Sequence, residues 1–484
     1  MKTRTFIIRA GLARMLCMGF VLASVTLAAS IGAASASSPG ELDQSFGVGG
    51  TVVTSMGGGM AQVTAVAILK GHEGHQDHHG AKGKANKDVK KFEILAGGPA
   101  LLSPGGLNRG FALARYNDDG TLDTTWGAGG KVLTTVGSGD AFAWAMAIQH
   151  DRKIVQAGYA YTPSGLPPPA PPAFKRFALV RYNEDGSLDS TFGSGGIVLT
   201  PVGPGSAVAR AVTIQGHRII VGGYSSRCVC DPVGQSSSFP GSLDTVAMAR
   251  YEEDGSLDAS FGRGGIATPL ASVTTLTRSN AEVVVQEDGK IVTGGIIASE
   301  GPSKVLTVRL NDDGSLDDSF NGTGYAATLV RGSDVALTTA LQADDKIVQA
   351  GFTSGATPGR TDLILTRLNA DGTPDTGFGV DGNGTVVTAL TTGLSAARAV
   401  TVNDDGKIIV VGRAHVAGGA TDLDFLVERY NTDGTLDSSF GVGGITTTNL
   451  GLVDQGQAVA LEHGRILTGG VSNDQFALVR YMDD

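Results

Sequence analysis

A loop with the residue types of a calcium site recurs along the chain. In the stretch RYNEDGSLDSTFGSGG, at 181–196, Asn183, Asp185 and Asp189 place side-chain oxygens at the spacing that calcium loops use. The first ligand position, however, is Arg181, a cation. A guanidinium repels a metal ion but donates paired hydrogen bonds to carboxylates. We therefore predict a metal-free turn in which the arginine holds the aspartate, with calcium binding and a plain Asx turn as the alternatives.

This arginine–aspartate pair, called here the turn clamp, repeats with a fixed separation of eight residues. The predicted pairs are Arg115–Asp123, Arg181–Asp189, Arg250–Asp258, Arg309–Asp317, Arg367–Asp375 and Arg429–Asp437, with Arg480 and Asp43 left over near the two ends. The regularity of both partners favours a clamp over an exposed arginine, and calcium is not expected as a cofactor.

The clamp aspartates belong to a longer repeat, G-x-L-D-x-x-F-G, which occurs seven times. The aspartates are spaced by 80, 66, 69, 59, 58 and 62 residues, so the basic unit is near 60 residues with insertions in the first three units. Each unit holds four short apolar runs bounded by Gly, Asp and Asn. In the third unit these are IVLT (197–200), ARAVTIQ (209–215), RIIVGGY (218–224) and TVAMARYE (245–252), and runs of this kind predict strands.

Four strands per unit, seven units and no helical pattern predict an all-β, seven-bladed β-propeller of four-stranded blades. A β-solenoid is the alternative, but its repeats are shorter and need polar capping units. The chain begins with the first strand of a unit and stops with the last. We therefore predict that GTVVT, at 50–54, completes the blade formed by 455–482, which would bring Asp43 to Arg480.

The repeated motif resembles the bacterial delta-60 repeat family over residues 40 to 484, and the strand order is similar to that of kelch propellers. The kelch likeness implies that ARAVTIQ is an innermost strand, RIIVGGY the second, AMARYE the third and IVLT the outermost. The second strand of every unit carries a glycine, which we expect to be required by packing: Gly98, Gly158, Gly223, Gly295, Gly351, Gly412 and Gly470. The resemblance implies a fold, not an activity.

Residues 1–36 have the pattern of a secretory signal peptide. Four basic residues precede the apolar run MLCMGFVLASVTLAASIGAA, and the Ala34-Ser35-Ala36 triplet offers a cleavage site; an uncleaved membrane anchor is the alternative. Residues 37–484 would then form one exported propeller domain, periplasmic, cell-surface or extracellular. Removing the four basic residues changes the formal charge of the chain from −10 to −14. This charge argues against nucleic acid and anionic membrane surfaces as partners.

Two segments could bind metals. The insertion 71–91 contains His72, His75, His78 and His79, and imidazoles bind zinc, copper or nickel. Because the segment is rich in Gly and Lys, a polar loop with weak transition-metal affinity is favoured over a formed site. Cys228 and Cys230 leave a disulfide, a free thiol pair and a soft-metal site open.

The second-to-third strand loops vary most, and include a Pro-rich loop at 159–175 and a long loop at 224–243. Loops on one face predict a binding surface for a protein or glycan partner. Nearby, one column of the inner strands changes from unit to unit, with Trp144, Arg210, Arg398 and Gln457 as candidate binding residues and Thr64, Ala281 and Leu337 at the same position elsewhere. We expect a binding or scaffold module. The alternative is a hydrolase- or lyase-type enzyme with its site at the central channel, although no G-x-S-x-G or H-E-x-x-H motif is present.

Overall fold

The short apolar runs of the repeat form twenty-eight strands in the part of the chain that the structure describes. The structure is a computed structural model, and it describes residues 38–70, 92–163, 173–226, 244–273, 276–298, 301–354, 359–390, 393–415, 423–451 and 453–484. The strands belong to one compact unit, Ser37–Asp484. None of the described residues belongs to a helix that could span a membrane.

Each repeat contributes one strand to each of four positions in a blade. The inner strands are β2 (Ala65–Lys70), β6 (Ala141–Ile148), β10 (Ala207–Gln215), β14 (Leu276–Val285), β18 (Asp334–Leu341), β22 (Ser395–Val402) and β26 (Asp454–Glu462). The second strands are β3 (Phe92–Leu101), β7 (Ile154–Pro163), β11 (Arg218–Ser226), β15 (Ile291–Ala298), β19 (Ile347–Ser354), β23 (Ile408–His415) and β27 (Arg465–Ser472).

The third strands are β4 (Arg109–Asn117), β8 (Ala173–Tyr182), β12 (Asp244–Tyr251), β16 (Lys304–Leu310), β20 (Thr361–Leu368), β24 (Leu423–Tyr430) and β28 (Gln475–Met482). The outer strands are β5 (Lys131–Thr134), β9 (Ile197–Thr200), β13 (Ile266–Ala267), β17 (Tyr325–Thr328), β21 (Thr385–Thr388), β25 (Ile445–Thr448) and β1 (Thr51–Thr54).

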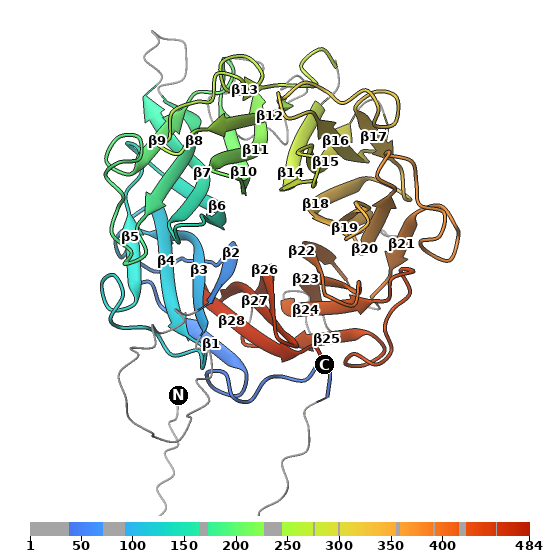
Figure 1. Cartoon of the computed structure of the whole chain (residues 1–484). Helices are drawn as coiled ribbons and strands as arrows, with labels where there is room; N and C mark the ends of the chain where they lie inside the picture. Colours follow the sequence, from blue (N-terminus) through green and yellow to red (C-terminus); the bar gives the residue numbers. More distant parts are fainter. Residues whose placement is uncertain are drawn as a thin grey trace, which may run out of the picture. The chain divides into compact units, whose positions relative to one another are not determined.

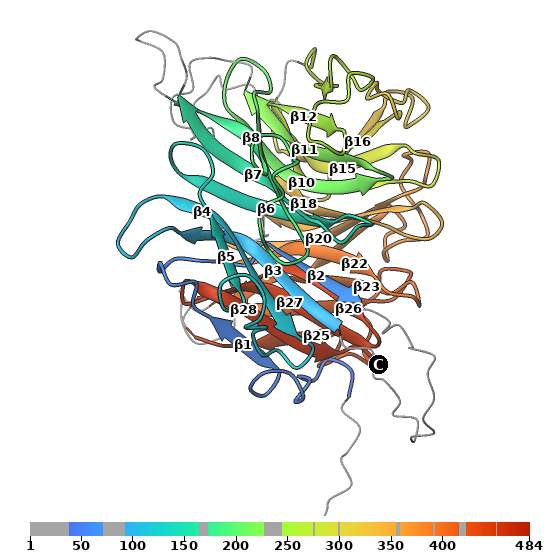
Figure 2. The ribbon, with the colours of Figure 1, turned by 60° about the vertical axis from the view of Figure 1, so that its left-hand side comes forward.

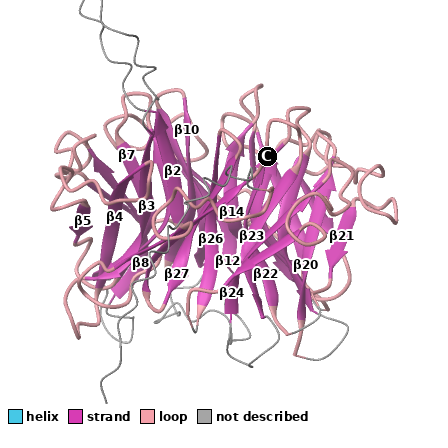
Figure 3. Cartoon of the chain, turned by 90° about the horizontal axis from the view of Figure 1, so that it is seen from below, coloured by secondary structure: helices cyan, strands magenta, loops and turns pink. Residues whose placement is uncertain are grey.

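These strands make seven four-stranded antiparallel sheets, each with the order inner, second, third and outer strand. We number the blades 1 to 7 from the sheet β2-β3-β4-β5. Figure 1 shows the sheets arranged around a common axis, with the inner strands nearest to it. In Figures 2 and 3 the strands of every blade run between two faces, and the connections gather at both. The predicted all-β, seven-bladed propeller of four-stranded blades is therefore confirmed.

Blade 7 is closed by the two ends of the domain. β1 pairs antiparallel with β28, with Thr51 opposite Val479 and Thr54 opposite Phe476. The backbone of the turn that precedes β1 joins the same blade, because the N–H of Asp43 donates to the carbonyl of Arg480 at 2.9 Å. The predicted pairing of the N-terminal strand with the C-terminal blade is confirmed.

The repeated glycine of the second strand is required by a close approach within the blade. A Cβ atom at Gly158 would lie 1.9 Å from the carbonyl oxygen of Phe142 in the neighbouring inner strand. The inner strand is irregular at this level: its register shifts between Ala143 and Ala145, which leaves Trp144 in a β-bulge. The bulge turns this residue toward the axis, and the glycine opposite leaves room for the bulged backbone.

Hydrophobic cores lie between consecutive blades and include repeated tyrosine contacts. The buried hydroxyl of Tyr182, in blade 2, donates to Thr134 Oγ1 in the outer strand of blade 1 at 2.9 Å. Three further pairs have the same form: Tyr116–Thr54, Tyr251–Thr200 and Tyr481–Thr448. Each satisfies a buried hydroxyl and ties a blade to its predecessor.

The Pro-rich loop predicted at 159–175 is shorter than expected. β7 continues to Pro163 and β8 begins at Ala173, with Tyr159 opposite Phe177 and Tyr161 opposite Lys175. Aromatic residues with high strand propensity extend the hairpin as far as Pro163, the first proline of the loop. Residues 164–172 lie outside the described residues, as do the predicted signal peptide 1–36, the four histidines of the 71–91 insertion, Cys228 and Cys230.

Candidate functional site

The two faces of the propeller carry different connections. The hairpins from inner to second strand and the N-x-D-G turns from third to outer strand lie on one face, called here the clamp face. The second-to-third strand loops and the connections into the next inner strand lie on the other, the loop face.

The clamp face brings the predicted arginines and aspartates together. Arg181 Nε donates to Asp189 Oδ2 at 2.8 Å, and the Oδ1 atom accepts from the backbone N–H and the hydroxyl of Thr191 at 3.0 and 2.6 Å. The same Nε–Oδ2 bond, at 2.7 to 2.9 Å, occurs in Arg115–Asp123, Arg250–Asp258, Arg309–Asp317, Arg367–Asp375, Arg429–Asp437 and Arg480–Asp43.

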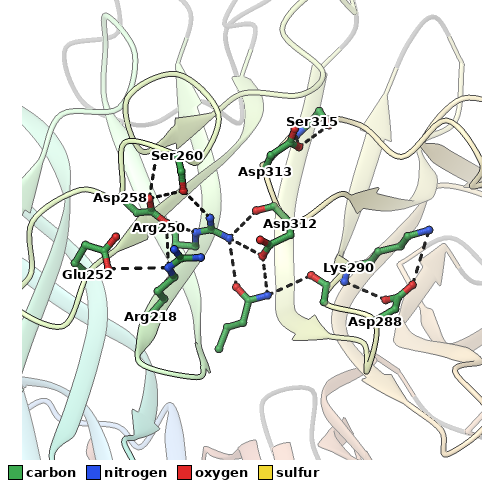
Figure 4. Close-up of polar contacts among 12 residues, drawn as sticks. Arg218, Arg250, Glu252, Asp258, Ser260, Asp288, Lys290, Asp312, Asp313 and Ser315 are labelled. Atoms are coloured by element: carbon green, nitrogen blue, oxygen red, sulfur yellow. Dashed lines mark hydrogen bonds and ion pairs between the residues drawn. The ribbon is translucent and has the colours of Figure 1, made fainter.

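Each clamp also reaches the next blade. In Figure 4, Arg250 Nη1 donates to the carbonyl oxygen of Asp312 at 2.6 Å and contacts the Asp312 carboxylate at 2.8 Å, while Nε holds Asp258. The contact recurs around the ring, and Arg480 closes it by donating to the Asp118 carbonyl of blade 1 at 2.6 Å. The Arg250 guanidinium also lies 4.9 Å from the centroid of the Phe261 ring. One buried cation therefore joins its own turn, an aromatic ring and the neighbouring blade.

A second cation reaches the clamp aspartate, which the sequence reasoning missed. Lys290, at the end of the hairpin QEDGK, lies 2.8 Å from Asp317. Five other blades have an equivalent pair: Lys153–Asp189, Arg218–Asp258, Lys346–Asp375, Lys407–Asp437 and Arg465–Asp43. The available signal was a Lys or Arg beginning each second strand after the hairpin turn.

The electrostatics of the clamp suit an ionised carboxylate. Burial alone would raise the pKa of Asp189, but hydrogen bonds from Thr191 and the charge of Arg181 lower it to about 2. Both carboxylate oxygens of Asp189 face hydrogen-bond donors. Arg181 and Lys153 therefore occupy the space that a metal ion would need beside this carboxylate. Within the described residues, no three His, Cys, Asp or Glu side chains are grouped to hold a metal ion.

On the loop face, the inner-strand bulges surround the mouth of the axial channel. A cavity of about 90 Å³ is lined there by one residue from each blade: Thr64, Trp144, Arg210, Glu282, Leu337, Arg398 and Gln457. We call these seven residues the mouth ring. A further cavity of about 280 Å³ follows the inner strands and shares several of these residues. All four predicted binding candidates, Trp144, Arg210, Arg398 and Gln457, belong to the mouth ring.

One member of the mouth ring differs from expectation. Ala281 was predicted at the blade 4 position, but Glu282 lines the cavity. In β14 the register shifts between Ser279 and Val283, so this bulge is one residue longer than those of the other inner strands. A count of residues back from the hairpin turn, using the distance found in the other blades, therefore gives Ala281 instead of Glu282. No residue type in the segment indicates that the bulge contains an extra residue.

Glu282 is held by the neighbouring blade. The backbone N–H of Thr339 donates to Glu282 Oε2 at 2.8 Å. Solvent reaches the side chain from the channel, but desolvation by the surrounding wall raises the pKa of Glu282 to about 7, against the opposing effect of hydrogen bonds from Thr338 and Thr339. Desolvation thus favours the neutral form of the one carboxyl group in the mouth ring.

Aromatic and amide groups fix the adjoining part of the mouth ring. Arg210 lies over the Trp144 ring, 3.8 Å from its centroid, and Phe142 packs 4.1 Å from the same indole. The buried indole N–H of Trp144 has no hydrogen-bond partner among the described residues. In blade 7, the Gln457 amide donates to Gln62, which precedes the inner strand of blade 1, at 3.3 Å.

Two arginines of blade 6 lie together at this end of the channel. Burial first, and then the charges of Arg413 and Arg210, lower the pKa of Arg398 to about 10. The Nε atoms of Arg398 and Arg413 are buried and make no hydrogen bond to any described residue, although Arg413 Nη1 donates to Gln455 at 3.0 Å. The mouth ring is therefore electropositive on the side of blade 6.

A family model of a β-propeller matches parts of the chain and agrees with the architecture. Six stretches match the family model described as "Domain of unknown function (DUF5122) beta-propeller": 94–125, 174–192, 233–261, 286–320, 342–378 and 404–440. No curated protein matches the chain.

Solved structures with a similar arrangement have low sequence identity. YCF48 bound to D1 peptide is 9% identical, with 93% of this chain and 98% of that chain covered and a TM-score of 0.43. An ulvan lyase of polysaccharide lyase family PL25 is 11% identical, with 90% and 96% covered and a TM-score of 0.46. Sqt1 from Chaetomium thermophilum is 11% identical, with 81% and 92% covered and a TM-score of 0.39.

Proposed function

We propose that this β-propeller repeat protein is an exported binding module that receives a protein or glycan partner at the mouth ring of its loop face. One observation carries the proposal: the seven blades each present one residue to a common cavity, and these seven residues are of six different types. Blade packing alone would favour one repeated residue, as it does for the clamp arginine and the second-strand glycine. Binding instead requires a specific mixture of charge, hydrogen-bonding groups and shape.

The clamp face has the opposite character, which supports the choice of the loop face. Its arginines are used in internal bonds, and its aspartates are held by hydroxyls and cations of their own blades. A partner would have to break these contacts to use them. We therefore assign the clamp a structural role without calcium or another required cofactor.

Export rests on the leader pattern of residues 1–36. Expression of the whole chain with its leader in a bacterium should yield a form lacking about 36 residues outside the cytoplasm. Amino-terminal sequencing of that form tests the proposal. A protein retained in the cytoplasm with its original N-terminus would contradict it.

Immobilised glycan and peptide libraries test the binding proposal. Leu337→Trp would fill the mouth ring without changing its charge, while Val442→Trp alters a residue that is 88% exposed on an outer turn of the clamp face. Ligands of the mature protein should be lost with Leu337→Trp and retained with Val442→Trp. If all ligands survive Leu337→Trp at equal affinity in a folded variant, the mouth ring is not the binding site.

An enzyme of the hydrolase or lyase type is the second candidate, favoured by Glu282. A carboxyl group whose pKa is raised to about 7 is suited to donate or accept a proton at neutral pH, and Arg210 and Arg398 could stabilise negative charge beside it. Product analysis after incubation with the ligands found above would distinguish turnover from binding. Catalysis should be lost in Glu282→Gln while ligand affinity is retained.

A further inference from the structure

Arg398 is the least compensated cation in the mouth ring. It makes no ion pair or hydrogen bond to any described residue, and its Nε atom is buried. Arg413 stands nearby on the second strand of the same blade, and its own Nε atom is likewise without a partner. A desolvated guanidinium is costly unless a negative charge accompanies it.

Among the described residues, no carboxylate contributes to the charge interactions of Arg398. Glu282 is the one carboxyl side chain of the mouth ring, and it bonds to Thr339 of blade 5. The repulsion felt by Arg398 comes from Arg413 and Arg210, so the three arginines act on a common region. An anion bound there would be attracted by all three, in a chain whose formal charge is −10 overall.

The other groups of the mouth ring indicate what the anion belongs to. Thr64 carries a hydroxyl, Gln457 an amide and Trp144 an indole N–H, while Leu337 is the single aliphatic residue. These groups match the hydroxyls of a sugar better than the methylene groups of an acidic amino-acid side chain. The planar fork of an arginine matches a carboxylate with two parallel hydrogen bonds.

We infer that the mouth ring binds the carboxylate of a uronic acid residue in an acidic glycan, with Arg398 as its principal contact and Arg413 and Arg210 supporting the charge. This inference rests on the proposed function and specifies its ligand. The neutral polar groups of the ring orient the sugar, with the Thr64 hydroxyl, which donates its hydrogen to the Ala143 carbonyl, as an acceptor, and the carboxylate points toward blade 6.

Calorimetric titration of the mature protein tests the inference with three probes: a trigalacturonate, its methyl ester and an acetylated Glu-Gly-Glu peptide amide. The trigalacturonate should bind, and esterification should weaken binding at least tenfold because the charge is removed. Raising the salt concentration should weaken the binding of trigalacturonate but not that of its ester. The peptide should bind at least tenfold more weakly than the trigalacturonate.

Two arginine variants locate the contact. Arg398→Gln should weaken trigalacturonate binding at least tenfold without lowering the melting temperature, because no internal ion pair is lost. Arg331→Gln is the matched control, since Arg331 lies on the same face but is paired with Asp362, and it should leave the affinity unchanged. Arg398→Lys should restore part of the affinity by returning the charge.

The outcomes separate this inference from the proposed function. Equal affinity for the ester or tighter binding of the peptide, each abolished by Leu337→Trp, would overturn the uronate inference and leave the binding module standing. Absence of any ligand sensitive to Leu337→Trp would overturn both. Unchanged trigalacturonate binding in Arg398→Gln would overturn the assignment of the carboxylate to blade 6.

Discussion

Arg480 holds Asp43 across the closure of the ring: its Nε atom donates to Asp43 Oδ2 at 2.9 Å, although 437 positions separate the two residues in sequence. The bond has the same form as Arg181–Asp189, whose partners are eight residues apart. The turn clamp therefore forms whether or not its two residues are close in sequence. The seventh clamp joins the two ends of the domain, whereas each of the other clamps joins consecutive strands.

Removal of the closing strand should destabilise the whole propeller. A variant that starts at residue 56 lacks β1 and Asp43, which leaves the edge of β28 unpaired and removes the clamp aspartate of Arg480. We expect a lower melting temperature and aggregation, measured by thermal unfolding with light scattering. A variant starting at residue 37 is the control. Equal stability of the two would show that closure does not hold the ring together.

Removal of one clamp arginine should cost about 1–3 kcal/mol of unfolding free energy, because buried acceptors lose their donor. Arg309→Ala removes bonds to Asp317 and to the Ala370 carbonyl, although Lys290 still approaches Asp317. Urea unfolding gives the measurement. The exposed Arg263→Ala serves as the control and should change stability little. A neutral effect of Arg309→Ala would contradict the structural role of the clamp.

Chelation of divalent cations should leave the melting temperature of the mature protein unchanged. The prediction follows from the donors that surround the clamp carboxylates, as Arg181 and Thr191 do for Asp189. Differential scanning calorimetry with and without EDTA measures it. A fall in melting temperature that added calcium reverses would show that a metal ion stabilises the fold.

Glu428 should make the propeller less stable as the pH rises toward neutrality. The side chain is fully buried beside Tyr430, and burial raises its pKa to about 7, whereas an unfolded glutamate has a pKa near 4.3. Its protonated form is favoured in the folded state. The contribution of protonated Glu428 to the free energy of unfolding is fully present below about pH 4.3. It is lost as the pH rises through about 7.

Glu428→Gln keeps the group neutral throughout this window. The variant should exceed the wild-type protein in unfolding free energy at pH 8 by on the order of 1–3 kcal/mol, and the difference should shrink at pH 5. Urea unfolding at several pH values provides the test. A difference that is constant between pH 5 and 8 would show that Glu428 does not titrate on folding.

The insertion between β2 and β3 should be dispensable for folding. Replacement of 71–91 by a short Asn-Gly turn should leave the melting temperature unchanged, because the segment interrupts a hairpin. The replacement should also abolish most retention on a nickel column, because the imidazoles of the insertion are removed. If the variant with the replaced segment does not fold, the assignment of 71–91 to a hairpin turn is wrong. If its retention on the nickel column is unchanged, the prediction of metal binding by this segment is wrong.

The sequence predicts the ring because each repeat carries the same turn chemistry, and the missing partners of Arg480 and Asp43 indicate where it closes. The mouth ring was predictable where the inner strand keeps a constant length, as at Arg210 and Arg398. It was not predictable at Glu282, because the extra residue in the β14 bulge leaves no compositional mark. The second cation at Asp317 had a signal in the Lys or Arg that follows the hairpin turn, but its contact depends on how two hairpins of a blade approach one another, which local spacing does not encode.

The offset between sequence repeat and blade has a consequence for how such a chain can change size. Each repeat begins with the outer strand of one blade and ends with the third strand of the next, as β9 to β12 do. An unequal crossover between two repeats would therefore add or remove whole units, and every β-strand would still have its partners in a four-stranded blade. The first and last segments would still match, whatever the number of units between them. The number of blades could then change by duplication or loss of a repeat. The limit is whether the blades can still pack into a closed ring.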